Sequence, residues 1–444
     1  MRLAVGRPHL RSAVGRIGRP RGTSMDEGSD KGKRTSPSKK GKKRFVTPPP
    51  APPPQKPAPP QLDEATKAKV AAAAEAAAAK KTRQEGEGSL CPNQMEAQPA
   101  QSVDAARFFA EYKGHPLDQL ELVHQTLAPS ADTVIFLAGD SSLDNKHWFF
   151  DGHRTKEGQL LGKKKRTFIG EATNGYERIL SPPRAVKDVA YWMNYLALER
   201  IGKPGSVVTI NASVEESTIG ERMAQEKLGA GGLLHHDKFI RDHLGTSPAD
   251  DVVVISVGGN DVALRPSVGT IAAVLALTTM PMAVLNTLGR WSPGFAHMEA
   301  MFHDEVEAIL QRIVNLPARR KAPRLIVACM IYYLDERPGG SWADHVLAQL
   351  GYDANPGKLQ FIISLLFDRL RERGFAVTSP DGSAVPVASL PLFRVLDGKD
   401  TRDYCQRVEP SVEGGRKMAG AILDVVAHRL GDRTPLPVAS TPLA

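Results

Sequence analysis

The chain has 444 residues and a formal net charge of +9, from 58 Lys and Arg against 49 Asp and Glu. Residues 1–100 hold 20 of the basic and 9 of the acidic side chains, which leaves 38 basic and 40 acidic side chains in residues 101–444. A domain that binds nucleic acid broadly needs a basic face of its own, so the charge argues against that class and we expect no specific nucleic-acid partner.

The first hundred residues are predicted to be a disordered basic, Pro-rich and Ala-rich tail. Residues 1–24 contain six Arg and no acidic residue, which resembles an organelle transit peptide. The alternative is translation from Met25. The first reading predicts a plastid or mitochondrial protein, and the second a cytoplasmic or nuclear one.

Three further segments of the tail have distinct compositions. The run Lys39–Arg44 is either a nuclear import signal or a solvated charge run. Residues 47–60 predict a polyproline II spacer. Residues 62–81 are Ala-rich and predict an exposed helix with little apolar surface to bury.

From residue 101 onward, short apolar runs alternate with amphipathic stretches. Four of the runs are almost continuously apolar, as in strands buried on both faces. Repeated alternation of strand and helix predicts a parallel sheet with helices on both faces. The predicted strands are Thr133–Ala138, Ser206–Ile210, Asp251–Val257, Arg324–Met330 and Phe393–Leu396. The predicted helices are Asp104–Leu127, Pro183–Ile201, His297–Leu316, Gly357–Arg373 and Ser411–Leu430.

An uncharged stretch of 22 residues, Val268–Gly289, follows the third predicted strand. Its length is sufficient to span a bilayer. However, its Thr, Asn, Gly and Pro residues dilute its apolar character. We therefore expect a buried or lid-forming helical insertion, with weak peripheral membrane contact as the second alternative.

Polar residues gather in the loops after the predicted strands, where the chemistry of a parallel α/β sheet is located. A Ser in the Gly139-Asp140-Ser141 turn can expose its hydroxyl to a cleft. Gly259 allows close approach of the backbone, and Asn260 can direct an amide N–H at a developing oxyanion. Each motif alone is common in turns, but their order at successive strand ends favours acyl transfer.

With these motifs the sequence resembles the SGNH (GDSL-type) hydrolase superfamily. The resemblance implies a three-layer α/β/α sandwich with a five-stranded parallel sheet, ester hydrolysis and no cofactor. It makes Ser141 the candidate nucleophile and Asn260 a candidate oxyanion donor. Asp144 would help to position Ser141, or would cap the helix that follows.

Two positions depart from the family pattern. Glu216 stands where the second block has a glycine whose backbone N–H joins the oxyanion hole. Glu409 stands where the fifth block has its histidine, and Gln406 where it has its aspartate. A backbone N–H is present for any residue except proline, so Glu216 can still contribute one.

The identity of the general base is therefore left open between three alternatives. Glu409 is the base, supported by Asp403 or Asp400. A histidine from another loop replaces it, with His147 the nearest in sequence to Ser141. In the third alternative the site binds a ligand without catalysis, because an unassisted serine hydroxyl is a poor nucleophile.

No metal site is predicted. Cys91, Cys329 and Cys405 do not form a zinc pattern and are too few for a disulfide framework. His236 and His243 lie on one face of a predicted helix, which favours an amphipathic helix edge over a metal site. The basic residues 163–166 predict a solvated loop tip.

The sequence thus predicts a tail over residues 1–100, an SGNH-like domain over 101–435 with a helical insertion around 266–300, and a disordered C-terminus over 436–444. The predicted function is hydrolysis of a small-molecule, lipid or carbohydrate ester through Ser141, Asn260, Glu216 and Glu409. The alternative is a catalytically degenerate ligand-binding or scaffold module.

Overall fold

The computed structural model describes residues 102–149, 168–227, 233–317 and 320–430. The predicted tail, the basic residues 163–166 and the C-terminal residues 436–444 lie outside these ranges.

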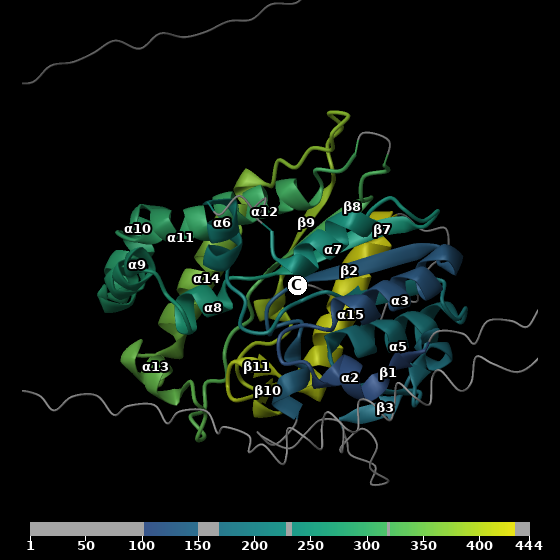
Figure 1. The fold of residues 1–444 in the computed structure, drawn as a ribbon. Coiled ribbons are helices and arrows are strands. Elements are labelled where there is room, and N and C mark those ends of the chain that lie inside the picture. Colours follow the sequence, from purple (N-terminus) through teal and green to yellow (C-terminus); the bar gives the residue numbers. More distant parts are fainter. Residues whose placement is uncertain (1–101, 150–167, 228–232, 318–319, 431–444) are drawn as a thin grey trace, which may run out of the picture. The chain divides into compact units, whose positions relative to one another are not determined.

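Five parallel strands form the central sheet, in the order β6-β2-β7-β8-β9 (Figure 1). Counted along the chain this order is 2-1-3-4-5, the flavodoxin-like arrangement of a doubly wound sheet. The first four predicted strands are confirmed to within one residue at each end. The bounds of the five strands are β2 (Thr133–Gly139), β6 (Val207–Asn211), β7 (Asp250–Ser256), β8 (Leu325–Met330) and β9 (Val387–Pro391).

The predicted fifth strand, Phe393–Leu396, is wrong. Phe393 lies in the 3-10 helix Leu392–Arg394, and the strand at the edge of the sheet is β9. The sequence of β9, VASLP, contains Ala, Ser and a terminal Pro. It therefore lacks the continuous apolar run that marks a buried strand, and Pro is tolerated there because the strand is at an edge.

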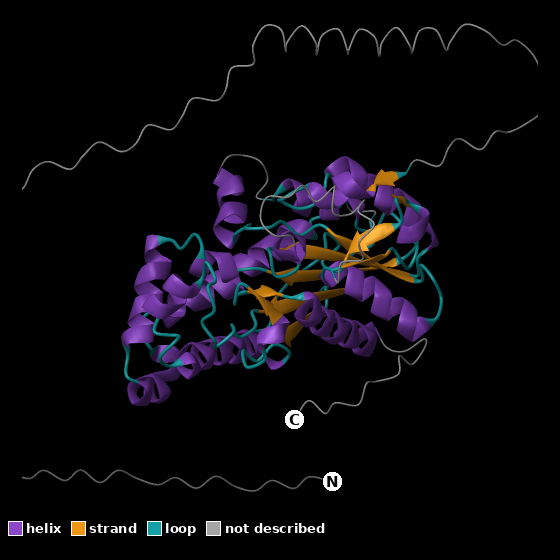
Figure 2. Ribbon diagram, turned by 90° about the horizontal axis from the view of Figure 1, so that it is seen from below, coloured by secondary structure: helices purple, strands orange, loops and turns teal. Residues whose placement is uncertain are grey.

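Helices cover both faces of the sheet, which confirms the predicted three-layer α/β/α sandwich (Figure 2). Alternate side chains of β2 divide between the two layers, with Val134 and Phe136 on one side and Ile135 and Leu137 on the other. The first side packs against α3 (Leu117–Leu127), α7 (His235–His243), α12 (Val306–Ile313) and α14 (Pro356–Arg373), and the second against α5 (Val189–Ile201) and α15 (Val412–Leu430).

Two predicted helices are shorter than expected. The segment Asp104–Leu127 forms α2 (Ala105–Ala110) and α3, because Gly114 adopts a left-handed φ of 77° and Pro116 precedes α3. The segment Pro183–Ile201 begins as the short strand β5 (Arg184–Val186). Its helix α5 starts only at Val189, where the Asp188 side chain accepts a hydrogen bond from the backbone N–H of Tyr191.

Short paired strands and a short helix lie between the larger elements of the described chain. The pairs are β1 (Val103–Asp104) with β4 (Leu180–Ser181), β3 (Ile169–Glu171) with β5, and β10 (Tyr404–Cys405) with β11 (Glu409–Pro410). The helix α6 (Ile219–Lys227) follows the loop after β6.

The segment after β7 is helical. It comprises α8 (Gly259–Ala263), α9 (Val268–Thr279), α10 (Met282–Leu288) and α11 (Phe295–Glu299), which lie near α13 (Asp344–Gln349) and α14 in Figure 1. No single helix of the described chain has the length and apolar character needed to cross a membrane. Val268–Thr279 and Met282–Trp291 meet that criterion only together, and they are bent by 112°.

Candidate active site

Ser141 lies in a tight turn directly after β2. The backbone N–H of Asp140 donates to the carbonyl of Ser256, and the Asp140 side chain accepts from the N–H of Ser142 at 3.0 Å. A side chain at Gly139 would collide with the Ser256 carbonyl oxygen, since its Cβ would lie 2.5 Å from that atom. The glycine therefore allows two strands to approach closely just before Ser141, a residue that is 6% exposed.

Glu216 occupies the loop after β6 in the conformation expected of a glycine. Its φ is +59°, in the left-handed region that disfavours most side chains. Its carboxylate accepts hydrogen bonds from the hydroxyl of Tyr112 at 2.9 Å and from Arg265 at 3.0 Å, and it lies 3.5 Å from the ammonium group of Lys113. The negative charge is thus compensated by two cations.

Asn260 follows β7 at the start of α8. Its Nδ2 donates one hydrogen bond to the Ser217 carbonyl at 3.1 Å, and an amide nitrogen carries a second hydrogen. The adjacent Asp261 accepts hydrogen bonds from the backbone N–H groups of Ile219 and Gly220 at the start of α6. These contacts hold the loop after β6 against the loop after β7.

Arg222, a residue that the sequence did not single out, is fully buried between the first two loops. Its guanidinium pairs with Asp237 at 2.9 Å and donates hydrogen bonds to the Gly139 carbonyl and the Ser217 hydroxyl, each at 3.1 Å. One charged group therefore connects β2, the loop after β6 and α7.

Glu409 lies beside Ser141 in the lining of the same cavity, and the Ser141 hydroxyl favours the charged form of its carboxyl group, which opposes the effect of burial on its pKa. Two hydrogen bonds fix the residues on either side of Glu409 in the chain, Val408 and Pro410. The Asn145 side chain donates to the Pro410 carbonyl at 2.9 Å, and the Tyr332 hydroxyl donates to the carbonyl of Val408 at 2.7 Å.

A tight turn between β10 and β11 carries Glu409. Gln406 and Arg407 both have positive φ values, +50° and +64°. The buried guanidinium of Arg407 pairs with Asp344 at 2.8 Å and Asp353 at 2.9 Å. These ion pairs fix the turn against the segment that follows β8, so a strained backbone is held by contacts distant in sequence.

Glu215 is a second buried carboxyl group that interacts with Glu409, and sequence reasoning missed it. Burial raises the pKa of both groups, and the charge of Glu409 raises the pKa of Glu215 further. Glu215 Oε1 accepts from the indole N–H of Trp148 at 3.1 Å. The Oε2 atoms of Glu215 and Glu409 are both buried without a hydrogen-bond partner among the described residues.

Asp144 lies in a fully buried ion pair with Lys146. Its Oδ2 atom accepts hydrogen bonds from the backbone N–H groups of Gly114 and Glu215. Asp144 thus connects the Ser141 turn to the loop after β6. A nearby buried cation was not expected from the sequence, because lysine is rarely buried.

The remaining predicted residues divide between the site and its surroundings. Gly259 lines the same cavity as Ser141. His147 lies with its ring against Tyr112 and Trp148 and is not among the residues that line that cavity. The carboxylate of Asp403 pairs with Lys417 of α15 at 2.7 Å, also outside the cavity lining. Asp400 pairs with Arg402.

The cavity that contains Ser141 has a volume of about 110 Å³. Its polar end holds Asp140, Ser141, Asn260 and Glu409, whereas most of its wall is apolar. Among the described residues that line it, none is a histidine.

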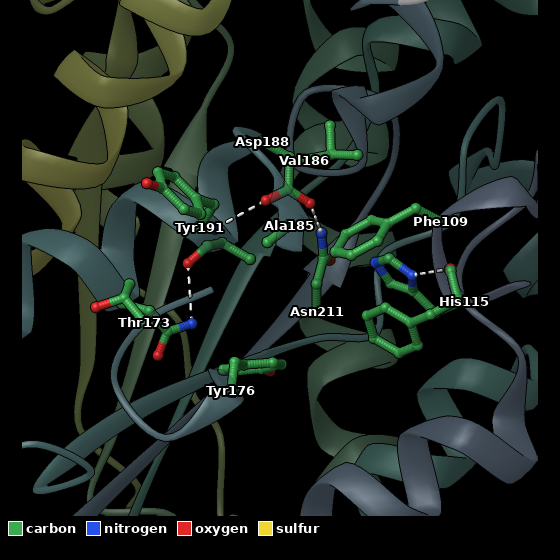
Figure 3. A pocket seen from close by; sticks show the side chains of 12 residues that line it. Phe109, His115, Thr173, Tyr176, Ala185, Val186, Asp188, Tyr191 and Asn211 are labelled. Carbon is green, nitrogen blue, oxygen red and sulfur yellow. Dashed lines mark hydrogen bonds between the residues drawn. The ribbon is translucent and has the colours of Figure 1, made fainter. Parts of the chain in front are cut away.

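A smaller pocket of about 30 Å³ lies next to the start of α5 (Figure 3). There the Asp188 carboxylate accepts hydrogen bonds from the Tyr191 backbone and the Asn211 side chain. Burial raises the pKa of Asp188 to about 7. This pocket shares no lining residue with the Ser141 cavity and has less than a third of its volume.

The helix α7, with its two predicted histidines, forms internal contacts. His236 hydrogen-bonds with the His115 carbonyl at 2.8 Å, and His243 lies 2.9 Å from Glu121. In the described part of the chain, no group of three or more His, Cys, Asp or Glu side chains is arranged to hold a metal ion.

Comparison with known proteins identifies similar solved structures at low sequence identity. No family model and no curated protein matches the chain. Axe2, an acetylxylan esterase from Geobacillus stearothermophilus, is 11% identical with a TM-score of 0.32, over 69% of this chain and 97% of that one. Est24, a carbohydrate acetylesterase from Sinorhizobium meliloti, is 12% identical with a TM-score of 0.33, over 67% and 99%. The aryl esterase of M. smegmatis is 15% identical with a TM-score of 0.31, over 66% and 98%.

Proposed function

We propose that this chain is a serine hydrolase of the SGNH type that cleaves carboxylic esters. The observation that carries the proposal is the placement of Ser141 beside the buried carboxyl group of Glu409 at the polar end of a largely apolar cavity. A nucleophile paired with a base, and a base held in turn by other groups, is the arrangement that activates a serine hydroxyl.

In this mechanism the Ser141 Oγ attacks the ester carbonyl and Glu409 takes its proton. The oxyanion is stabilised by the backbone N–H groups of Ser141 and Glu216 and by the second hydrogen of Asn260 Nδ2. Glu409 then gives its proton to the leaving alcohol. In the second half of the reaction, Glu409 takes a proton from the water that attacks the acyl-enzyme. It returns this proton to Ser141 Oγ as the bond between Oγ and the acyl carbon breaks and the carboxylic acid leaves.

Burial makes Glu409 a stronger base than an ordinary carboxylate. A solvated glutamate has a pKa of about 4.3, far below that of a serine hydroxyl, and accepts its proton poorly. Burial raises the pKa of Glu409 to about 8. The carboxylate form then has a basicity suited to general-base catalysis near neutral and mildly alkaline pH.

A fluorophosphonate probe tests the proposal, because it labels an activated serine covalently. We expect labelling of the wild-type chain and none of Ser141→Ala. The control is Ser142→Ala, which should still be labelled, since the Ser142 hydroxyl is hydrogen-bonded to Ser256 at 2.7 Å. Absence of wild-type labelling between pH 5 and 9, in a folded protein, would overturn the proposal and favour a non-catalytic binding module.

A further inference from the structure

The wall of the Ser141 cavity is almost entirely aliphatic and aromatic. It is built by the helices α8, α9, α11, α13 and α14 and by the segment after β8. Its apolar residues include Ala263 of α8 and Val274 and Leu277 of α9.

Two polar groups in this wall, the hydroxyls of Thr278 and Tyr332, are already engaged with the backbone. The Thr278 hydroxyl donates to the Val274 carbonyl at 2.8 Å, and the Tyr332 hydroxyl donates to the carbonyl of Val408 at 2.7 Å. A sugar or another polyhydroxylated group placed against the aliphatic part of this wall would lose its hydrogen bonds to water without gaining new ones, which is unfavourable. An alkyl chain would lose only contact with water, which is favourable.

The helix α9 separates the cavity from solvent. Val274 and Leu277 on one side of α9 face the cavity and are 8% and 1% exposed, whereas the adjacent Leu275 is 48% exposed. The cavity wall at this place is therefore one helix thick. Val274 on its inner side can be varied to change the cavity, and the adjacent Leu275 on its outer side offers a matched control.

We propose that the cavity binds the alkyl chain of the substrate's acyl group, so that the enzyme acts on esters of medium-chain or long-chain fatty acids in preference to acetate esters. This inference rests on the proposed function, because it assigns the apolar cavity to the acyl group that is attached to Ser141 in the acyl-enzyme.

The first test is the value of kcat/KM for p-nitrophenyl acetate, butyrate and octanoate. Burial of one methylene group corresponds to a gain of roughly fourfold in kcat/KM until the cavity is filled. We therefore expect octanoate to exceed acetate by at least tenfold. An acetate value equal to or above the octanoate value would overturn the inference. So would a preference for octyl acetate without any preference for octanoate, because that would place the alcohol in the cavity.

Variants of α9 and α8 test whether the preference comes from this cavity. Val274→Trp fills it and should lower the octanoate-to-acetate ratio by at least tenfold, whereas Leu275→Trp on the exposed side should leave the ratio unchanged. Ala263→Leu is a smaller change that should lower the ratio if Val274→Trp does not fold. An unchanged ratio in a folded cavity variant would contradict the assignment.

Binding of decanoate to the Ser141→Ala chain, measured by calorimetry, separates this inference from the proposed function. If no ester is hydrolysed but decanoate binds and Val274→Trp weakens that binding, the alkyl site stands and the hydrolase proposal fails. If acetate is hydrolysed but decanoate does not bind and chain length has no effect, the hydrolase proposal stands and the alkyl site fails.

Discussion

Ser141 and the buried Glu409 line the same cavity side by side, although 268 positions separate the two residues in the chain. In the SGNH pattern that the sequence resembles, the position of Glu409 would be occupied by a histidine. The structure instead places a buried glutamate beside the candidate nucleophile, with a second buried glutamate, Glu215, interacting with it. The pH dependence of the protein should reflect this substitution.

Activity should rise with pH through the pKa of Glu409. The base is active only when it is deprotonated, and burial raises its pKa to about 8. We therefore expect the acidic limb of kcat/KM near pH 8. Glu409→Gln should lower kcat by about 10²–10⁴-fold, and Glu409→His should move the limb down toward the usual histidine value of about 6.5. Full activity at pH 5 in the wild-type enzyme would show that Glu409 is not the base.

The stability of the protein should fall with pH because of the same carboxyl group. Its pKa is about 8 in the folded state against 4.5 for the ordinary group, so between these values the folded state keeps a proton that the unfolded state has lost. The stabilisation is complete below pH 4.5 and lost as the pH rises through 8. The free energy of unfolding of Glu409→Gln, taken relative to that of the wild type, should therefore rise by on the order of 3 kcal/mol when the pH is raised from 5 to 9. Urea unfolding of the two proteins at pH 5 and at pH 9 measures this change. The same difference in stability between variant and wild type at both pH values would contradict the prediction.

Removal of the Asn260 amide should reduce catalysis without abolishing labelling of Ser141. Loss of one oxyanion donor typically costs about 10²–10³-fold in kcat. Asn260→Ala should show this loss with little change in KM, because the hydrogen bond forms chiefly in the transition state. Steady-state kinetics with a p-nitrophenyl ester measures the two constants separately, and a rise in KM at constant kcat would instead assign Asn260 to substrate binding.

Replacement of Glu216 distinguishes its backbone from its side chain. Glu216→Gly keeps the N–H and suits the positive φ of 59°, so we expect activity within about threefold of the wild type. The partly exposed ion pair with Arg265 that it removes contributes little. Glu216→Pro removes the N–H and cannot adopt this φ, so it should be inactive. If Glu216→Gly were inactive, the carboxylate itself would be required for catalysis.

Loss of the Arg222 guanidinium should destabilise the fold severely. Arg222→Met leaves the fully buried Asp237 without its cation and should cost about 3–5 kcal/mol in the free energy of unfolding. Arg222→Met combined with Asp237→Leu should recover much of this loss. Arg107→Met, which breaks a pair with Asp118 that is more than half exposed, is the matched control and should have little effect. Equal effects of the two single variants in urea unfolding would contradict the role given to Arg222.

The sequence determined the frame of the fold and the candidate nucleophile. Buried parallel strands require continuous apolar runs, so four strands were predicted to within one residue, and Ser141 and Asn260 were placed at strand ends that meet at one edge of the sheet. The edge strand β9 was missed because its composition is not that of a buried strand. The break between α2 and α3 was missed because the apolar pattern continues on both sides of it.

Only the tertiary structure decided which groups surround Ser141. Local patterns indicate whether a residue is in a strand or a helix, but they do not indicate which side chains from distant segments meet. The contact of Glu409 with Ser141 depends on a turn held by Arg407 and Asn145, and the direction of the Glu216 side chain depends on Arg265. The raised pKa values of Glu215 and Glu409 likewise arise from burial, which exists only once these segments have packed together.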